Sequence, residues 1–148
     1  MFVFLDTGVL GMVTHPRASA QNRDSTGWLS ETLESGHIVV IPEIVDYELR
    51  RELIRAKKNE GLERLDALVE ALLYLPLTTS VMKRAAGLWA DARNEGRPTA
   101  PMEALDADVI LASQALSLAT ATDSVIVATT NVGHLSRFVD ARSWREIP

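Results

Sequence analysis

In the stretch Phe2-Val3-Phe4-Leu5-Asp6-Thr7-Gly8-Val9-Leu10, four consecutive apolar residues run directly into an aspartate. Such runs, rich in β-branched and aromatic residues, are typical of strands that are buried on both faces in a parallel sheet. Ligands of these sheets bind outside the carboxyl ends of the strands, so Asp6 is expected at a ligand-binding edge. Thr7 and Gly8 are interpreted as a turn, and Asp6 has a second interpretation as the cap of that turn.

The composition is that of a globular chain, with 148 residues, 47% of them hydrophobic, no cysteine and a formal net charge of −5. This length suits one domain over residues 1–148, and the absence of cysteine excludes disulfides, thiol catalysis and thiolate-bound zinc. The sequence contains no apolar run near the roughly 20 residues of a membrane helix, and no signal peptide precedes the first strand. We therefore expect a cytoplasmic protein, and the negative charge disfavours broad non-specific binding to nucleic acid.

Strands of the same buried kind alternate with helices along the chain. Further strands are expected over residues 37–41 and 124–129, with edge strands over 75–78 and 143–147. Helices are expected over residues 27–34, 43–59, 62–73, 80–95, about 103–118 and 135–139, with loops over 12–23 and 96–101. This alternation predicts an α/β fold, a three-layer α/β/α sandwich with a mainly parallel central sheet.

The helix predicted after Pro42 carries the next informative acid. Glu48 lies close to the inward stripe of this helix, which consists of Ile44, Val45, Leu49, Leu53 and Ile54. Arg51 and Arg55 follow on the side of Glu48, within a basic stretch that contains the cations needed near phosphates. The same arginines are also interpretable as a solvated surface paired with Glu52. The sequence shows no aromatic-rich basic platform for stacking single strands.

Two aspartates near the start of the predicted helix 103–118 are separated by helical periodicity. Asp108 heads an apolar stripe, which continues through Leu111, Ala112, Ala115 and Ala119. A buried, ionised carboxylate requires a cation or hydrogen-bond donors, so Asp108 is a candidate site residue. Asp106 lies on a more polar face and is interpreted as an acid stabilised by the helix dipole.

Two strand ends and two helix starts deliver oxygen-bearing side chains toward one edge of the sheet. These residues are Asp6, Glu48, Asp108 and Asn131. Oxygen ligands suit hard cations such as Mg²⁺ or Mn²⁺. Such a site orients water and stabilises charge on a phosphodiester during in-line displacement. We expect Asp6, Glu48 and Asp108 to hold the metal, and Asn131 to bind it or a metal-bound water.

With these residues in place, the chain resembles the PIN-domain family, which includes the VapC-like ribonuclease toxins of bacterial toxin–antitoxin pairs. Four segments carry the resemblance, in the family's order: FLDTGVL (4–10), IPEIVDYELRREL (41–53), LDADVILASQAL (105–116) and IVATTNVGHLSRF (126–138). The resemblance implies an α/β/α sandwich, cleavage of RNA with Mg²⁺ or Mn²⁺, and metal-site acids at Asp6, Glu48 and Asp108. For a toxin of the family it also implies an antitoxin that covers the site, and a homodimer.

The sequence departs from the family pattern at three positions. Gly8 stands where relatives often carry asparagine or serine, Asn131 fills the fourth acidic position, and His134 replaces a frequent aspartate. Three carboxylates are expected to hold metal less tightly than four, which leaves the number of ions open. The candidate substrate contacts are Thr7, Arg51, Arg55 and His134, and His134 is also interpretable as a structural residue.

Two alternatives are weighed against the nuclease. The Asp6-Thr7-Gly8 triplet matches the aspartic-protease signature, but those enzymes are almost wholly β, and the helical periodicities after Pro42 contradict that fold. A PIN-like module that binds RNA or protein with weak or no catalysis stays open. The sequence also leaves open which RNA is cut, whether the protein is a toxin or a housekeeping nuclease, and whether Asp106 assists Asp108.

Overall fold

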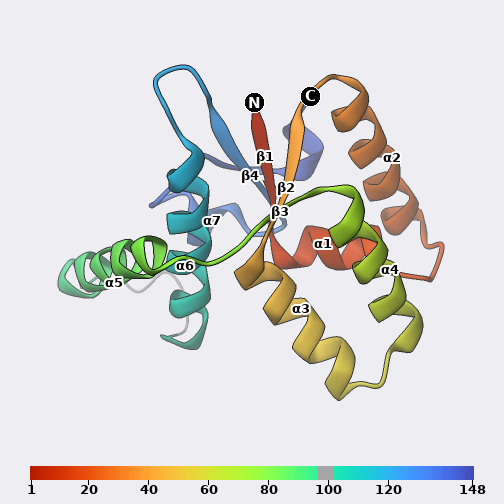
Figure 1. Ribbon diagram of the computed structural model, residues 1–148, viewed down its shortest axis with the longest axis horizontal. Helices are drawn as coiled ribbons and strands as arrows, with labels where there is room; N and C mark the ends of the chain where they lie inside the picture. Colours follow the sequence, from red (N-terminus) through yellow and green to blue (C-terminus); the bar gives the residue numbers. More distant parts are fainter. Residues whose placement is uncertain (97–101) are drawn as a thin grey trace.

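The computed structural model describes residues 1–96 and 102–148 (Figure 1). Its centre is a sheet of the strands β1 (Phe2–Leu5), β2 (Ile38–Pro42), β3 (Leu73–Leu75), β4 (Val125–Thr129) and β5 (Ala141–Ser143). The strand order is β3-β2-β1-β4-β5, and every described pair is parallel. The predicted parallel sheet is confirmed, with β1 at its centre, but the edge strands β3 and β5 each begin two residues before the ranges predicted for them, 75–78 and 143–147.

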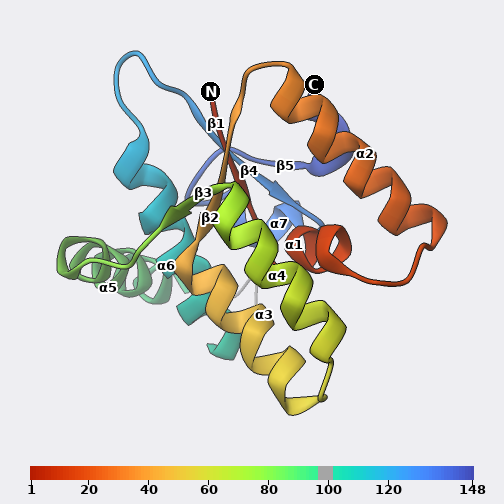
Figure 2. The same ribbon diagram turned by 45° about the vertical axis from the view of Figure 1, so that its right-hand side comes forward.

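Helices cover both faces of this sheet. They are α1 (Thr7–Thr14), α2 (Ala20–Glu34), α3 (Glu43–Arg55), α4 (Asn59–Ala71), α5 (Thr79–Asn94), α6 (Met102–Leu118) and α7 (Val132–Leu135), and a 3₁₀ turn spans Trp144–Glu146. Helices α1, α2 and α4 lie on one side, and α5 and α6 on the other (Figure 1). Helices α3 and α4 run side by side beyond the sheet (Figure 2). The predicted three-layer sandwich is therefore confirmed.

The core consists mainly of the three central strands. Val3, Phe4 and Leu5 of β1 are completely buried, as are most residues of β2 and β4. Burial on both faces explains why these strands read as continuous apolar runs rather than alternating ones. The edge strands are shorter, and Leu73 of β3 is 43% exposed. None of the helices in the described part of the chain has the length and apolarity needed to cross a membrane.

The largest correction concerns the segment after β1. Residues Thr7–Thr14 form α1 rather than a turn that leads into a loop, and the carboxylate of Asp6 accepts the Thr7 N–H at its start. Val9 and Leu10 bury the inner face of α1. Helix α2 begins at Ala20 instead of residue 27, because the Ser19 hydroxyl accepts the Asn22 N–H and provides an earlier cap. The sequence hid this helix because its first turns are mostly polar and exposed.

Other boundaries move by a few residues. Helix α3 ends at Arg55 and α4 already starts at Asn59, since Lys57 adopts a positive φ of 56° that breaks the predicted helix 43–59. Helix α7 lies before the predicted turn 135–139, and the predicted strand 143–147 is largely the 3₁₀ turn after β5. Ile54 is 58% exposed instead of inward, because it lies in the last turn of α3. The predicted loop 96–101 lies, apart from Gly96, outside the described residues.

A buried amide links the elements on which the edge of the sheet depends. Gln114 of α6 is completely buried. Its Oε1 accepts the N–H of Ile44 at 3.2 Å, and its Nε2 donates to the carbonyl of Leu75 at 2.8 Å. Gln114 thereby joins α6 to the first turn of α3 and to the end of β3. These bonds fix where α3, with Glu48 in its second turn, leaves the sheet.

We predict that Gln114→Met lowers the free energy of unfolding by about 2 kcal/mol, because a buried N–H and a buried carbonyl lose their partner. Urea denaturation measures the change. The control is Ser117→Ala, since the exposed Ser117 hydroxyl bonds only within α6, to the Gln114 carbonyl. An unfolding midpoint of Gln114→Met equal to that of the wild type would contradict the role given to the amide.

Candidate metal centre

The carboxylate of Asp6 is held at the end of β1 by two donors. Its Oδ1 accepts the backbone N–H of Thr7 at 2.8 Å, and its Oδ2 accepts the hydroxyl of Thr129 at 2.6 Å. Thr129 is the last residue of β4 and is completely buried. Hydrogen bonds to an ionised acceptor are among the strongest in proteins, so they fix the orientation of Asp6. The same Thr129 oxygen accepts the N–H of Asn131 at 3.0 Å, which ties the start of α7 to this point.

Glu48 reaches the same edge from α3. Its Oε1 accepts the hydroxyl of Thr7 at 3.0 Å, so Thr7 contacts Asp6 through its backbone and Glu48 through its side chain. Burial raises the pKa of Glu48, the Thr7 hydrogen bond opposes the rise, the charge of Asp6 adds to it, and Arg51 lowers the pKa. The carboxylate of Glu48 therefore lies within the electrostatic reach of both Asp6 and Arg51.

Asp108 approaches from α6 and is the most perturbed acid of the site. Burial, followed by the charge of Asp6, raises its pKa from 3.8 to about 6; His134 opposes the rise and Glu48 adds to it. Its Oδ2 is buried and has no hydrogen-bond partner among the residues that the structure describes. Asp6 and Glu48 are therefore close enough to Asp108 to influence its pKa, as the predicted convergence of the three acids requires. The predicted stripe behind Asp108 is buried at Leu111, Ala112 and Ala115, whereas its last member, Ala119, is exposed because α6 ends at Leu118.

Asp106 faces elsewhere, as the helical periodicity indicated. Its side chain is exposed, and it lines a separate hollow between α5 and α6 together with Met82 and Trp89. The pKa of Asp108 responds to Asp6, His134 and Glu48, with no contribution from Asp106 among its causes. The two aspartates are therefore a natural pair for comparing a site residue with its neighbour.

Asn131 and His134 contact one another at the rim. Asn131 is the N-cap residue of the short helix α7, and its Nδ2 lies 3.2 Å from Nδ1 of His134. His134 is near enough to lower the pKa of Asp108, which places its ring beside the acids. The contact with Asn131 engages one ring nitrogen, and it leaves Nε2 as the nitrogen that a substrate can use.

The two candidate arginines of α3 differ in their surroundings. Arg55 is exposed and bonded to Glu52, at 3.1 Å from Nε to Oε1, as in the solvated-surface interpretation. Arg51 forms none of the ion pairs found among the described residues; it influences Glu48, and its guanidinium lies 5.0 Å from the ring centre of Tyr47. The structure thus brings Arg51, but not Arg55, to the acids.

The donor set fits a hard divalent cation. Asp6, Glu48 and Asp108 supply carboxylate oxygens, and Asp108 Oδ2 is a buried oxygen that lacks any other partner. Within residues 1–96 and 105–148, however, no three Asp, Glu or His side chains lie as a ready-made set of ligands. Asp6 is close enough to contribute to the raised pKa of both Glu48 and Asp108, and the three side chains would have to move closer together to surround an ion.

Thr129 and Thr130 are site residues that the sequence did not single out. Thr129 holds Asp6, as described above. A Cβ atom at Gly8 would lie 2.7 Å from the Thr130 Oγ1, so the glycine at this position leaves room for Thr130. The only signal in the sequence was a pair of threonines at the end of an apolar strand, where threonine is also an ordinary strand former.

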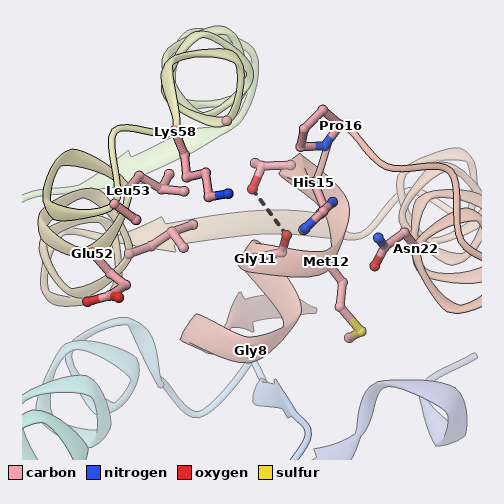
Figure 3. Close-up of a pocket in the computed structure, with 13 residues that line it drawn as sticks. Gly8, Gly11, Met12, His15, Pro16, Asn22, Glu52, Leu53 and Lys58 are labelled. Atoms are coloured by element: carbon pink, nitrogen blue, oxygen red, sulfur yellow. Dashed lines mark hydrogen bonds between the residues drawn. The ribbon is translucent and has the colours of Figure 1, made fainter.

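A groove opens beside the site between α1, α3 and α4 (Figure 3). It has a volume of about 440 Å³ and a mainly apolar lining, which includes Met12, Pro16 and Leu53, while Glu52 and Lys58 add charged groups. Gly8 and Leu49 also line it, and these residues directly follow Thr7 and Glu48 in the sequence. The groove therefore runs along α1 and α3, and its lining includes none of the three acids.

Comparison with known proteins identifies the class. The model of the PIN domain family matches residues 3–132, and the chain belongs to the PIN domain family. The chain is also similar to three solved structures. These are VapBC2 from Rickettsia felis bound to a promoter DNA fragment (17% identity, TM-score 0.73, 97% of this chain and 99% of that chain), FitAcB from Neisseria gonorrhoeae (25%, 0.71, 98% and 99%) and VapBC-1 from nontypeable Haemophilus influenzae (20%, 0.66, 99% and 100%). No curated protein sequence matches the chain.

The raised pKa of Asp108 predicts a pH-dependent effect on stability. Because the folded-state pKa lies above the ordinary value, the stabilising contribution is complete only below about pH 3.8 and is lost as the pH rises through about 6. Asp108→Asn is therefore expected to have a higher free energy of unfolding than the wild type at pH 8 in EDTA, by on the order of 1 kcal/mol after allowance for partial exposure, and so to melt at a higher temperature. At about pH 3, below the ordinary pKa, the two proteins are expected to unfold alike.

Thermal unfolding at both pH values measures this difference. Asp106→Asn, an exposed neighbour on the same helix, is the control and is expected to gain nothing at pH 8. Equal melting of wild type and Asp108→Asn at pH 8 would mean that the ionised Asp108 is not held at a free-energy penalty.

Proposed function

We propose that the protein is an endoribonuclease that depends on Mg²⁺ or Mn²⁺. The observation that supports this function best is the buried, unpartnered Oδ2 of Asp108 in the electrostatic field of Asp6 and Glu48. Acids are held at such a free-energy penalty where a site has been arranged for function rather than for stability. In this proposal Asp6, Glu48 and Asp108 hold the cation, and its charge removes the repulsion between them.

When bound, such a cation lowers the pKa of an attacking water and stabilises negative charge on the phosphodiester. The residues of the chain provide the positioning. Thr129 and the Thr7 N–H orient Asp6, and the Thr7 hydroxyl orients Glu48. No side chain needs to act as the nucleophile.

Contacts to the substrate are assigned by position. Thr7 and Arg51 lie beside Glu48, and the guanidinium of Arg51, which forms no ion pair within the described part of the chain, is available to a phosphate. Asn131 contributes its amide to the cation or to its water, and it holds the ring of His134 so that Nε2 is left for a phosphate or the leaving oxygen. Arg55 is at most a weak contact, because Glu52 already neutralises it.

A second candidate function is an RNA- or protein-binding module with weak or no catalysis. The observation in its favour is the contact of Asn131 with His134, two non-acidic residues at positions where the family resemblance implies acids. Binding of a divalent cation and cleavage of RNA distinguish the two functions, since an inactive module does neither.

We predict that Asp108→Asn reduces cleavage of single-stranded RNA in Mn²⁺ by about a hundredfold or more, because one of three metal-holding carboxylates is lost. The same variant is expected to lose the rise in melting temperature that Mn²⁺ gives the wild type through preferential binding to the folded state. Asp106→Asn is the matched control and is expected to cleave RNA and to respond to Mn²⁺ like the wild type. Cleavage by Asp108→Asn at the wild-type rate would point to a contaminating nuclease or to another site.

We further propose that the nuclease is the toxin of a toxin–antitoxin pair, that it acts in the cytoplasm and that it forms a homodimer. Support comes from membership of the PIN domain family and from the similarity to chains solved as VapBC and FitAcB assemblies. The groove of Figure 3 offers an antitoxin segment a mainly apolar surface along α1 and α3. An antitoxin seated there would lie against Gly8 and Leu49, the sequence neighbours of Thr7 and Glu48, and in this proposal its remaining surface excludes RNA from the acids.

A growth assay tests the toxin proposal. Induced expression of the wild type is expected to slow growth of a bacterial host, and Asp6→Asn at the same protein level is expected to relieve the inhibition. Growth inhibition that is equal for both proteins would show that toxicity does not depend on the proposed metal centre.

A further inference from the structure

Next to Glu48, helix α3 exposes an aromatic side chain. Tyr47 is 55% exposed, and no hydrogen bond of its hydroxyl is found among the described residues. Burial in the core therefore does not account for the ring. The guanidinium of Arg51, one turn further along α3, lies 5.0 Å from the ring centre, within the range of a cation–π contact. An aromatic ring and an arginine thus form a stacked pair on the helix that carries one of the site acids.

The ring also borders a hollow of about 480 Å³ where α3, α5 and α6 meet. Apolar side chains make up much of its lining, among them Ile44, Leu77, Met82 and Ile110. Met82 is itself 42% exposed. The hollow is linked to the site through α3, because Tyr47 lines it and contacts Arg51, which in turn influences Glu48. An apolar space of this kind suits a flat, uncharged group.

The charges around the hollow favour different positions for the base and for the phosphate of a nucleotide. Its acids, Glu43 and Asp46, accept the Tyr74 hydroxyl at 3.3 and 3.2 Å, and Asp46 is also paired with Arg50 at 3.0 Å. A phosphate is disfavoured beside these carboxylates, whereas an uncharged base is not. Arg51, on the side of Glu48, provides the cation that a phosphate requires. The chemistry thus favours a base at Tyr47 and a phosphate at Arg51.

We infer that Tyr47 and this hollow form a nucleobase subsite, which takes the base of a nucleotide next to the scissile phosphate of single-stranded RNA. The inference rests on the proposed nuclease function, and it adds a residue and a hollow that bind one base of the RNA strand. Stacking on an aromatic face tolerates any base, and it favours purines because their faces are larger. Recognition here is therefore by shape and stacking rather than by a fixed sequence.

Steady-state cleavage of a single-stranded RNA in Mn²⁺ tests the subsite with the full-length protein. Tyr47→Leu is expected to raise KM about tenfold with little change in kcat, because an aromatic–base stack contributes roughly that factor or more to affinity. Tyr47→Phe keeps the ring and is expected to behave like the wild type. An RNA that lacks the base beside the mapped cleavage position is expected to raise KM for the wild type, and to leave KM of Tyr47→Leu unchanged.

The matched control uses a second aromatic–arginine pair. Trp89 of α5 is 36% exposed, with the guanidinium of Arg93 5.1 Å from its ring, but it does not stand on the helix of Glu48. Trp89→Leu is expected to leave KM unchanged. If the wild type cuts RNA and Tyr47→Leu has the same KM and the same response to the abasic strand, the subsite is wrong and the nuclease stands. If the wild type cuts no RNA, the proposed function is wrong and the subsite with it.

Discussion

The site depends on one constraint, the mutual repulsion among three carboxylates at the end of a parallel sheet. Asp6 follows the central strand, Glu48 extends from α3, and Asp108 extends from α6, so each acid belongs to a different packed element. Partial burial, and after it the like charge of Asp6, raises the pKa of Glu48 and Asp108. The buried strands around them must therefore supply the free energy that holds the acids together, since the acids themselves oppose it.

Two threonines and one glutamine position the acids. Thr7 connects two of the acids, and Thr129 connects the first acid to the neighbouring strand. Gln114 fixes the start of α3 from inside the core. Because all three act through hydrogen bonds in buried or half-buried places, the geometry of the site is determined largely by the scaffold and only in part by the acids.

The sequence predicted those parts of the fold that depend on a single periodicity. The apolar runs located β1, β2 and β4, and the stripe behind Asp108 distinguished it from Asp106. Helix α1 was missed because Thr7 and Gly8 favour a turn, and only the cap by Asp6 together with burial of Val9 and Leu10 makes the segment helical. Tertiary packing decided that segment, and no local pattern contained the information.

The sequence predicted the charged residues of the candidate site better than it predicted the residues that position them. Carboxylates at strand ends stand out against apolar runs, but Thr129 does not, since threonine is common in strands. Gln114 lies among small residues of α6 and gives no sign that it will be buried. Tyr47 was not singled out, because a single aromatic residue in a sequence does not indicate a base-stacking surface. Its proposed role depends on the contact with Arg51 and on a hollow formed by three helices.

The tight approach of Gly8 to Thr130 has an evolutionary consequence. The two positions compete for one small volume at the mouth of the site, since any Cβ on the first meets the hydroxyl of the second at 2.7 Å. A lineage that acquires serine or asparagine at the first position must shorten or turn the side chain at the second. The two residues are therefore expected to change together among descendants of this chain, as compensating substitutions rather than as independent ones.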